Sequence, residues 1–169
     1  ALDLMAYLLL RGSDQYSLQD IADKSIEAGG GATANATGNS ITIQIVAKKE
    51  KFADYFKFML DVLKKPKFEQ SQFDLIKSQS LSALDRPYTE PETVAALTMT
   101  RLLETYQPGD LRYHFEPELS KQQIKAATVE QVKKLYQNFF VSNHAQIAIT
   151  GDYQAKAMLK ILQKEFGAW

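Results

Sequence analysis

The feature that most constrains this chain is residues 52–63, where large apolar side chains recur with the spacing of one helical face. They occupy positions i, i+3, i+4, i+7, i+8 and i+11 of an amphipathic helix, and Pro66 ends the segment. Because such a face needs another apolar surface to cover it, the chain must also supply a sheet or further helices. The residues of this face are Phe52, Tyr55, Phe56, Met59, Leu60 and Leu63.

Capping signals predict further helices on both sides of this segment. Ser17 is followed three residues later by Asp20, which forms a capping box, and the three glycines at 29–31 end the helix that follows. Thr128 and Gln131 repeat the signal ahead of a helix that reaches Phe140. We expect other helices over residues 4–10, over about 69–85, from Thr89 to Tyr106 with Ala95, Met99, Leu102, Leu103 and Tyr106 as its buried face, and over 158–166.

Strand signals are few and short. Residues 41–45 alternate between apolar and polar side chains, and residues 32–37 can pair with them across a Gly38-Asn39 turn, which predicts a hairpin. Residues 145–149 alternate in the same way and predict a further strand, whereas two prolines and a glycine in 107–119 predict an ordered loop. The fold class predicted is therefore α+β, with a small, mostly antiparallel sheet packed against several helices in one domain over residues 1–169.

Composition excludes several classes of protein. Lys plus Arg equals Asp plus Glu at 20 each, so the chain lacks the basic surface of a nucleic-acid-binding protein. With no cysteine it has neither disulfides nor thiolate metal ligands, which suits the cytoplasm and equally the periplasm. The apolar stretch from Leu4 to Leu10 is too short to span a bilayer, so we expect neither nucleic acid nor membrane as a partner.

The residue types of common catalytic sites are absent or badly spaced. The histidines, His114 and His144, are thirty positions apart, so they form no zinc-binding pair, and Pro117 interrupts any helical face that would join His114 to Glu116 and Glu118. There is no Gly-x-Ser-x-Gly nucleophile motif and no Cys nucleophile. We therefore predict no catalytic residue and no metal ligand in this chain.

Two stretches remain as candidate binding segments. The glycine-rich run at 29–38 lacks a Gly-Lys-Ser/Thr ending and precedes a strand, so it is interpreted as a helix end leading into a strand. Its small residues would let another backbone approach an edge strand, which makes Gly31, Ala32, Thr33, Ala34 and Asn35 candidate peptide-binding residues. In the loop after residue 107, Arg112 beside Tyr113 either clamps a substrate carboxylate or ties down its own loop.

Four segments together resemble the insulinase/pitrilysin family of zinc peptidases. The resemblance runs through most of the chain and is most specific in the last of the four, in which a helix and a Ser-Asn step precede a strand that ends in Gly-Asp. The segments are LLLRGS with the following helix and Gly-Gly break at 8–30, PKFEQSQFDLIKSQSLSALD, YQPGDLRYHFEPEL, and TVEQVKKLYQNFFVSNHAQIAITGDY.

The chain departs from this family at each residue that would bind zinc. The catalytic half of the family carries His-x-x-Glu-His before an apolar run and Gly-Ser/Thr, and alignment on Gly12-Ser13 places these three residues at Asp3, Ala6 and Tyr7. Neither alanine nor tyrosine can replace a catalytic glutamate or a histidine ligand, and residues 73–84 contain no Glu as a third ligand. The opening stretch is therefore expected to serve packing only.

The resemblance thus implies a domain of the non-catalytic, degenerate half of a two-half metalloendopeptidase. Such a domain would form part of the chamber that encloses the substrate, with the catalytic half of the same parent chain and the peptide substrate as its partners. Zinc is expected only in that catalytic half. In catalytic halves the strand after the Gly-Gly break pairs with substrate backbone, which places residues 31–35 at the analogous position.

The resemblance also implies that the chain is a fragment with an exposed sheet edge, because family domains begin with several strands before the first helix. A homodimer in a crystal would be consistent with that edge. The alternative function is a scaffold or assembly protein of the same fold without a peptidase role. A bacterial, periplasmic location is the expectation, with the cytoplasm as the alternative.

Overall fold

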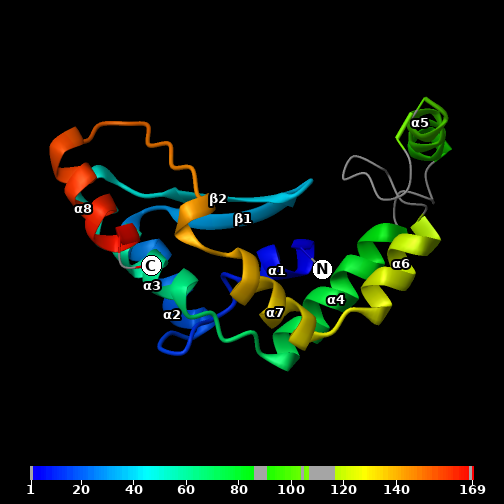
Figure 1. The fold of residues 1–169 in the computed structure, drawn as a ribbon, viewed down its shortest axis with the longest axis horizontal. Helices are drawn as coiled ribbons and strands as arrows, with labels where there is room; N and C mark the ends of the chain where they lie inside the picture. Colours follow the sequence, from blue (N-terminus) through cyan, green and yellow to red (C-terminus); the bar gives the residue numbers. More distant parts are fainter. Residues whose placement is uncertain (1, 86–90, 104, 107–116, 168) are drawn as a thin grey trace.

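The computed structural model describes residues 2–85, 91–103, 105–106, 117–167 and 169. It confirms the α+β class, with one two-stranded sheet among the described residues and helices along the rest (Figure 1). The elements are α1 (Leu2–Leu8), α2 (Leu18–Ala28), β1 (Gly31–Thr37), β2 (Ser40–Val46), α3 (Lys49–Lys64), α4 (Gln70–Asp85), α5 (Pro91–Leu102), α6 (Pro117–Ala126), α7 (Val129–Phe139), a short 3-10 helix (Ser142–His144) and α8 (Ala155–Gly167).

The predicted hairpin is present and its register is regular. β1 and β2 pair antiparallel from Gly31 opposite Val46 to Thr37 opposite Ser40. The two-residue turn between them has Gly38 at φ 60°, and Asn39 has no positive φ, a combination typical of a type II′ turn. The side chains of Ile41, Ile43 and Ile45 on β2 pack against the core.

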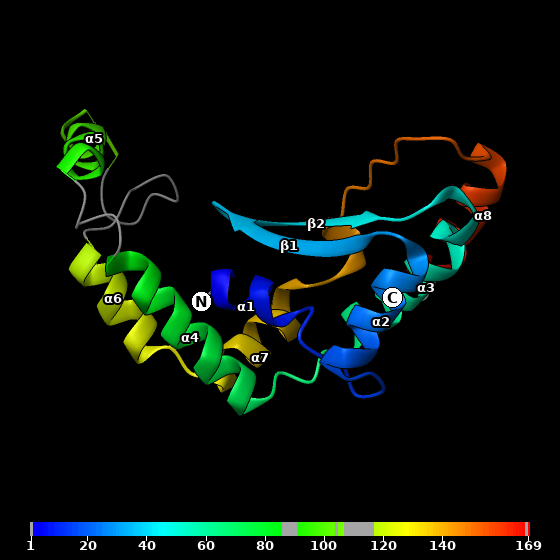
Figure 2. The same cartoon turned by 180° about the vertical axis from the view of Figure 1, so that it is seen from behind.

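Helix α1 occupies the centre of the molecule. It lies beneath the hairpin and packs against β1, α4 and α7, as both views of the ribbon show (Figures 1 and 2). This placement explains why a seven-residue helix is so apolar: most of its circumference is covered. The core around it comprises Leu4, Met5, Leu8, Leu9, Phe56, Leu60, Leu63, Phe68, Phe73, Ile76, Ala127, Val129 and Val132.

Helix α2 ends with the geometry that its glycines predict. Gly29 adopts a left-handed φ of 60°; its N–H donates to the carbonyl of Ile26, and the Gly30 N–H donates to the carbonyl of Ser25, which is a Schellman cap. Gly30 then passes very close to Val46 at the end of β2. The glycine run is therefore a helix end that turns directly into a strand.

One ion pair joins α3 to α8, and a second joins α3 to the turn that precedes α8. Lys64 Nζ lies 3.1 Å from Glu165 Oε2 in a partly buried pair, and Lys49 Nζ lies 2.6 Å from Asp152 Oδ2 at the surface. Lys64 also lies over the ring of Trp169, 5.7 Å from its centroid. None of the described helices combines the length and apolar character that a bilayer crossing requires.

Three predictions need correction. Residues 145–149 form no strand and pair with no described strand, because alternation gives a segment two faces without supplying a hydrogen-bonding neighbour. The predicted loop 107–119 is wrong at its end, since α6 begins at Pro117, a proline in the first helical turn; residues 107–116 lie outside the described part.

The third correction concerns α5. It forms within the predicted range, yet the face expected to be buried is exposed, at Ala95, Met99, Leu102, Leu103 and Tyr106. Figures 1 and 2 show the reason: α5 stands apart from the helices and sheet of the body. An apolar stripe predicts a face that needs a cover, and no described element provides one.

Candidate functional site

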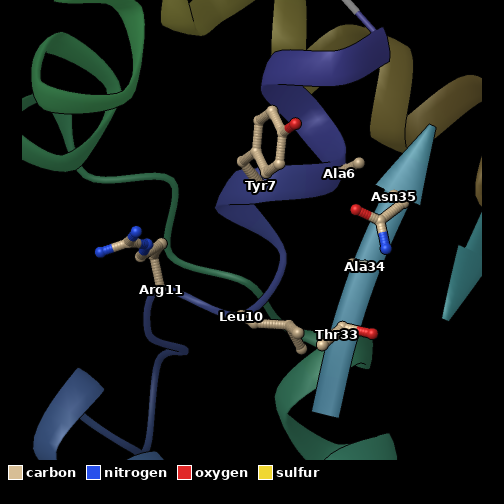
Figure 3. A pocket seen from close by; sticks show the side chains of 7 residues that line it. All are labelled: Ala6, Tyr7, Leu10, Arg11, Thr33, Ala34 and Asn35. Atoms are coloured by element: carbon tan, nitrogen blue, oxygen red, sulfur yellow. The ribbon is translucent and has the colours of Figure 1, made fainter. Parts of the chain in front are cut away.

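A pocket of about 260 Å³ lies between α1 and β1 (Figure 3). This volume accommodates a side chain rather than a single water molecule. The pocket brings together the opening stretch and three of the five predicted strand residues, although they are far apart in sequence. Its lining residues are Ala6, Tyr7, Leu10, Arg11, Thr33, Ala34 and Asn35.

The helical wall of the pocket is formed by α1 and the residues that directly follow it. Ala6 is 0% exposed and contributes a methyl group to the floor, whereas Tyr7 is 48% exposed and stands at the rim. Figure 3 shows Leu10 directed toward Thr33 and Arg11 directed away from β1. The side chains of residues 6, 7, 10 and 11 share this wall because residues four apart lie on the same side of a helical turn.

Backbone hydrogen bonds fix the end of this wall. Gly12 has a φ of 123°, which turns the chain sharply after Arg11, and its carbonyl accepts the Lys67 N–H at 3.1 Å. The Asp14 N–H donates to the carbonyl of Lys65 at 3.0 Å. Residues 65–67 thus hold the Arg-Gly-Ser segment in place at the end of the helical wall.

The other wall is the outer edge of β1. In a two-residue hairpin the residues that flank the turn exchange hydrogen bonds, so Thr37, Asn35 and Thr33 point their backbone groups toward β2. The backbone N–H and C=O groups of the alternate residues, Ala34 and its neighbours two positions away, must then point off the outer edge. No other described strand pairs with that edge.

The side chains of β1 are as small as the sequence analysis anticipated. Ala34 is buried against the core, so its backbone meets the pocket while its methyl group packs inward. Thr33 and Asn35 are exposed and border the pocket on either side of it. A second extended backbone could therefore approach the edge without meeting a large side chain.

The residues at the zinc-ligand positions of the resembled family do not fit a metal ion. Ala6 has no donor atom and is fully buried, Tyr7 contributes a phenol in place of an imidazole, and Asp3 is exposed. In the described part of the chain, no group of three or more His, Asp or Glu side chains is arranged to hold a metal. None of the residues that line the pocket is a carboxylate or a histidine, so the lining holds no side chain of the kind that accepts a proton from a metal-bound water.

The remaining predicted residues fall in two places. Gly31 and Ala32 lie on β1 but do not line the pocket, and Arg112 and Tyr113 lie outside the described residues. Ala6, Tyr7, Leu10 and Arg11 were not predicted as site residues, because the opening stretch was expected to serve packing only. The spacing of four between Ala6 and Leu10 and between Tyr7 and Arg11 is the signal that places them on one wall.

Residues 3–118 match the model of a protein family described as Insulinase (Peptidase family M16). This match covers α1, the hairpin and both walls of the pocket. A search of curated proteins found no match to the chain.

Proposed function

Because the chain belongs to the insulinase family, peptidase family M16, we propose that it is a non-catalytic domain of a zinc metalloendopeptidase of that family. In this proposal it forms part of the chamber that encloses the substrate and offers peptides a binding surface. The catalytic half of the same longer protein would hold the zinc ion and carry out hydrolysis.

The observation that carries the proposal is the open edge of β1 beside the pocket. Peptides commonly bind proteins by adding a strand to such an edge, where main-chain hydrogen bonds give affinity and pockets for alternate side chains give selectivity. Ala34 is the middle one of the three β1 residues that line the pocket, so its outward-facing backbone N–H and C=O groups lie beside the pocket. A bound peptide would place one side chain in the pocket and point its neighbours outward.

The residues of α1 support the proposal that this domain is not catalytic. Hydrolysis by a metallopeptidase needs three ligands and a general base, and the aligned positions offer Asp3, Ala6 and Tyr7. Packing accounts for this helix instead, since Leu4, Met5 and Leu8 are all buried. The domain would contribute to turnover by holding the peptide, so its effect would appear in substrate binding rather than in the chemical step.

Peptide binding to the edge is tested with backbone-methylated peptides. A fluorescein-labelled, extended eight-residue peptide is titrated with the protein, alongside two versions that carry N-methyl groups at odd or at even positions. Because only alternate amides of an added strand face the edge, one methylated version should lose binding and the other should keep it. Equal binding of both, or no binding of any peptide, would refute an edge-binding surface.

A scaffold or assembly role in the same family is the alternative function, and a second assay addresses it. Adding zinc and a quenched fluorescent peptide to this chain should give no cleavage of the peptide. Zinc should also leave the melting temperature unchanged, because only a metal ion that binds the native state raises it. A scaffold should give the same result, but it would also fail the methylated-peptide test. Zinc-dependent cleavage by this chain would refute the non-catalytic assignment.

A further inference from the structure

Arg11 is the one charged residue among those that line the pocket, and its charge is not compensated there. No carboxylate lines the pocket, and Arg11 makes no ion pair with any carboxylate of the described ranges. Many described lysines on the surface also make no ion pair, but Arg11 differs from them because it lines the pocket. The pocket therefore has an excess of positive charge at one end.

The position of Arg11 makes this charge available to a ligand. Its backbone is held by the sharp turn at Gly12, whose carbonyl is tied to Lys67, and its N–H donates to the carbonyl of Leu8 at 3.1 Å. The side chain is half-buried and leaves the helix end on the side away from β1 (Figure 3). Arg11 is therefore on the far side of the pocket from β1, with Leu10 between it and Thr33, while Ala6 lies beside the strand (Figure 3).

A guanidinium presents a planar fork of N–H donors that matches the two oxygens of a carboxylate. A peptide side chain that enters from the β1 edge must cross the apolar floor before its end meets this fork. A long side chain with a methylene stem and a terminal carboxylate has this combination of properties, and so does a peptide that ends at the pocket with its own α-carboxylate. Neutral polar ends would leave the charge of Arg11 unpaired.

From this arrangement we infer that the pocket selects peptides that carry a carboxylate, which Arg11 binds at the rim while the peptide backbone pairs with β1. The inference rests on the proposed function, since it names the class of peptide that the same edge accepts. It assigns Arg11 as a specificity-determining residue that touches substrate.

The test uses three labelled eight-residue peptides of Ala, Val and Ser. The first has a central Glu and an amidated C-terminus, the second has Gln in that position and the same amide, and the third has Gln with a free C-terminal carboxylate. Fluorescence polarisation should show the Glu peptide, the free-acid peptide, or both binding about tenfold more tightly than the neutral peptide. This preference should shrink as salt is added.

Substitution of Arg11 then identifies the residue responsible. Arg11→Gln should remove the preference for the carboxylate peptides and leave the neutral peptide unchanged. Lys160→Gln removes the same charge from an exposed position on α8 and is the matched control, with no expected effect. The comparison of wild-type protein with charged and neutral peptides stays decisive even if Arg11→Gln folds poorly.

The outcomes separate the inference from the proposal beneath it. Tighter binding of either the Glu peptide or the free-acid peptide supports the inference and shows whether Arg11 binds a side-chain carboxylate or a C-terminal one. Equal binding of all three peptides overturns the inference and leaves edge binding intact. Absence of binding by any of the three overturns both.

Discussion

Replacing Gly30 by alanine should destabilise the domain strongly, and the adjacent glycine provides the control. A Cβ at Gly30 would overlap the carbonyl oxygen of Val46, and it would lie 2.5 Å from the Val46 carbonyl carbon and 2.8 Å from the Ala47 Cα. These atoms belong to the backbone, so no rotamer change can relieve the overlap. At Gly31 the added Cβ would meet no atom within 4 Å, and its φ lies outside the positive range.

The expected loss of stability in Gly30→Ala depends on which part of the backbone must move. Relieving the overlap requires the end of β2 to shift away from the end of α2, where Gly31 and Val46 form the last pair of the ladder. Overpacking of a well-packed site costs about 1–3 kcal/mol, and a contact made entirely by backbone belongs at the upper end. We expect Gly30→Ala to cost about 3 kcal/mol, which for a chain of this size lowers the melting temperature by about 6–12 °C. Gly31→Ala should be neutral or stabilising by up to about 1 kcal/mol, because alanine restricts the unfolded chain.

Urea denaturation followed by circular dichroism measures both variants against the wild type. The midpoint should fall for Gly30→Ala with an unchanged slope, since the surface exposed on unfolding stays the same. A free energy of unfolding for Gly30→Ala within about 0.5 kcal/mol of the wild-type value would refute the close approach of β2 to the end of α2. A large loss in Gly31→Ala would refute the open surroundings assigned to the start of β1.

Three further measurements test the packing around the site. Phe73→Ala should cost about 3–5 kcal/mol because Phe73 is 2% exposed in the core, whereas Leu75→Ala, 44% exposed on the same helix, should cost less than about 1 kcal/mol in the same urea titration. Glu165→Gln should cost about 1 kcal/mol because its pair with Lys64 is partly buried, and Asp152→Asn should cost less than about 0.5 kcal/mol because its pair with Lys49 is exposed; similar losses would contradict the difference in burial. Burial raises the pKa of Tyr136 to about 12, so the folded state holds this proton more tightly than the unfolded state, and the free energy of unfolding should fall as pH rises from about 10 to about 12. In Tyr136→Phe the free energy of unfolding should fall less over that pH range. The same pH dependence in the variant and the wild type would assign the effect to other groups.

Local rules predicted most of the secondary structure. Ser17 and Asp20 form the predicted capping box, and so do Thr128 and Gln131, because these bonds depend only on residues three apart. The hairpin is equally local, since a glycine in a two-residue turn sets the register of both strands.

Two of the three errors occurred where the outcome depends on distant partners, and the third was local. The alternation in residues 145–149 predicts two faces but cannot show whether a neighbouring strand is present to pair with them. The apolar stripe of α5 likewise predicts a face that needs a cover, and Met99 and Leu102 are nevertheless exposed. α6 was missed because Pro117 was interpreted as a loop residue, although proline is common in the first turn of a helix.

The lining of the pocket could be anticipated on one side only, and peptide binding by these residues stays a prediction. Thr33, Ala34 and Asn35 were identified because small residues on one strand are visible in the sequence. The opposite wall required knowing that α1 lies beneath β1, a contact between segments with no local signal that joins them. That contact is what brings Tyr7 and Arg11 to the same pocket.

Hydrogen exchange of the β1 amides, measured by NMR with and without a bound peptide, tests the central claim most directly. In the free protein the amides of Ala32, Ala34 and Ala36 should exchange quickly, whereas those of Thr33 and Asn35 should be protected by their bonds to β2. Adding the extended peptide should slow exchange at the alanine positions. Uniform protection along β1 in the free protein, or alanine amides that the peptide leaves unchanged, would contradict an open edge that binds peptides.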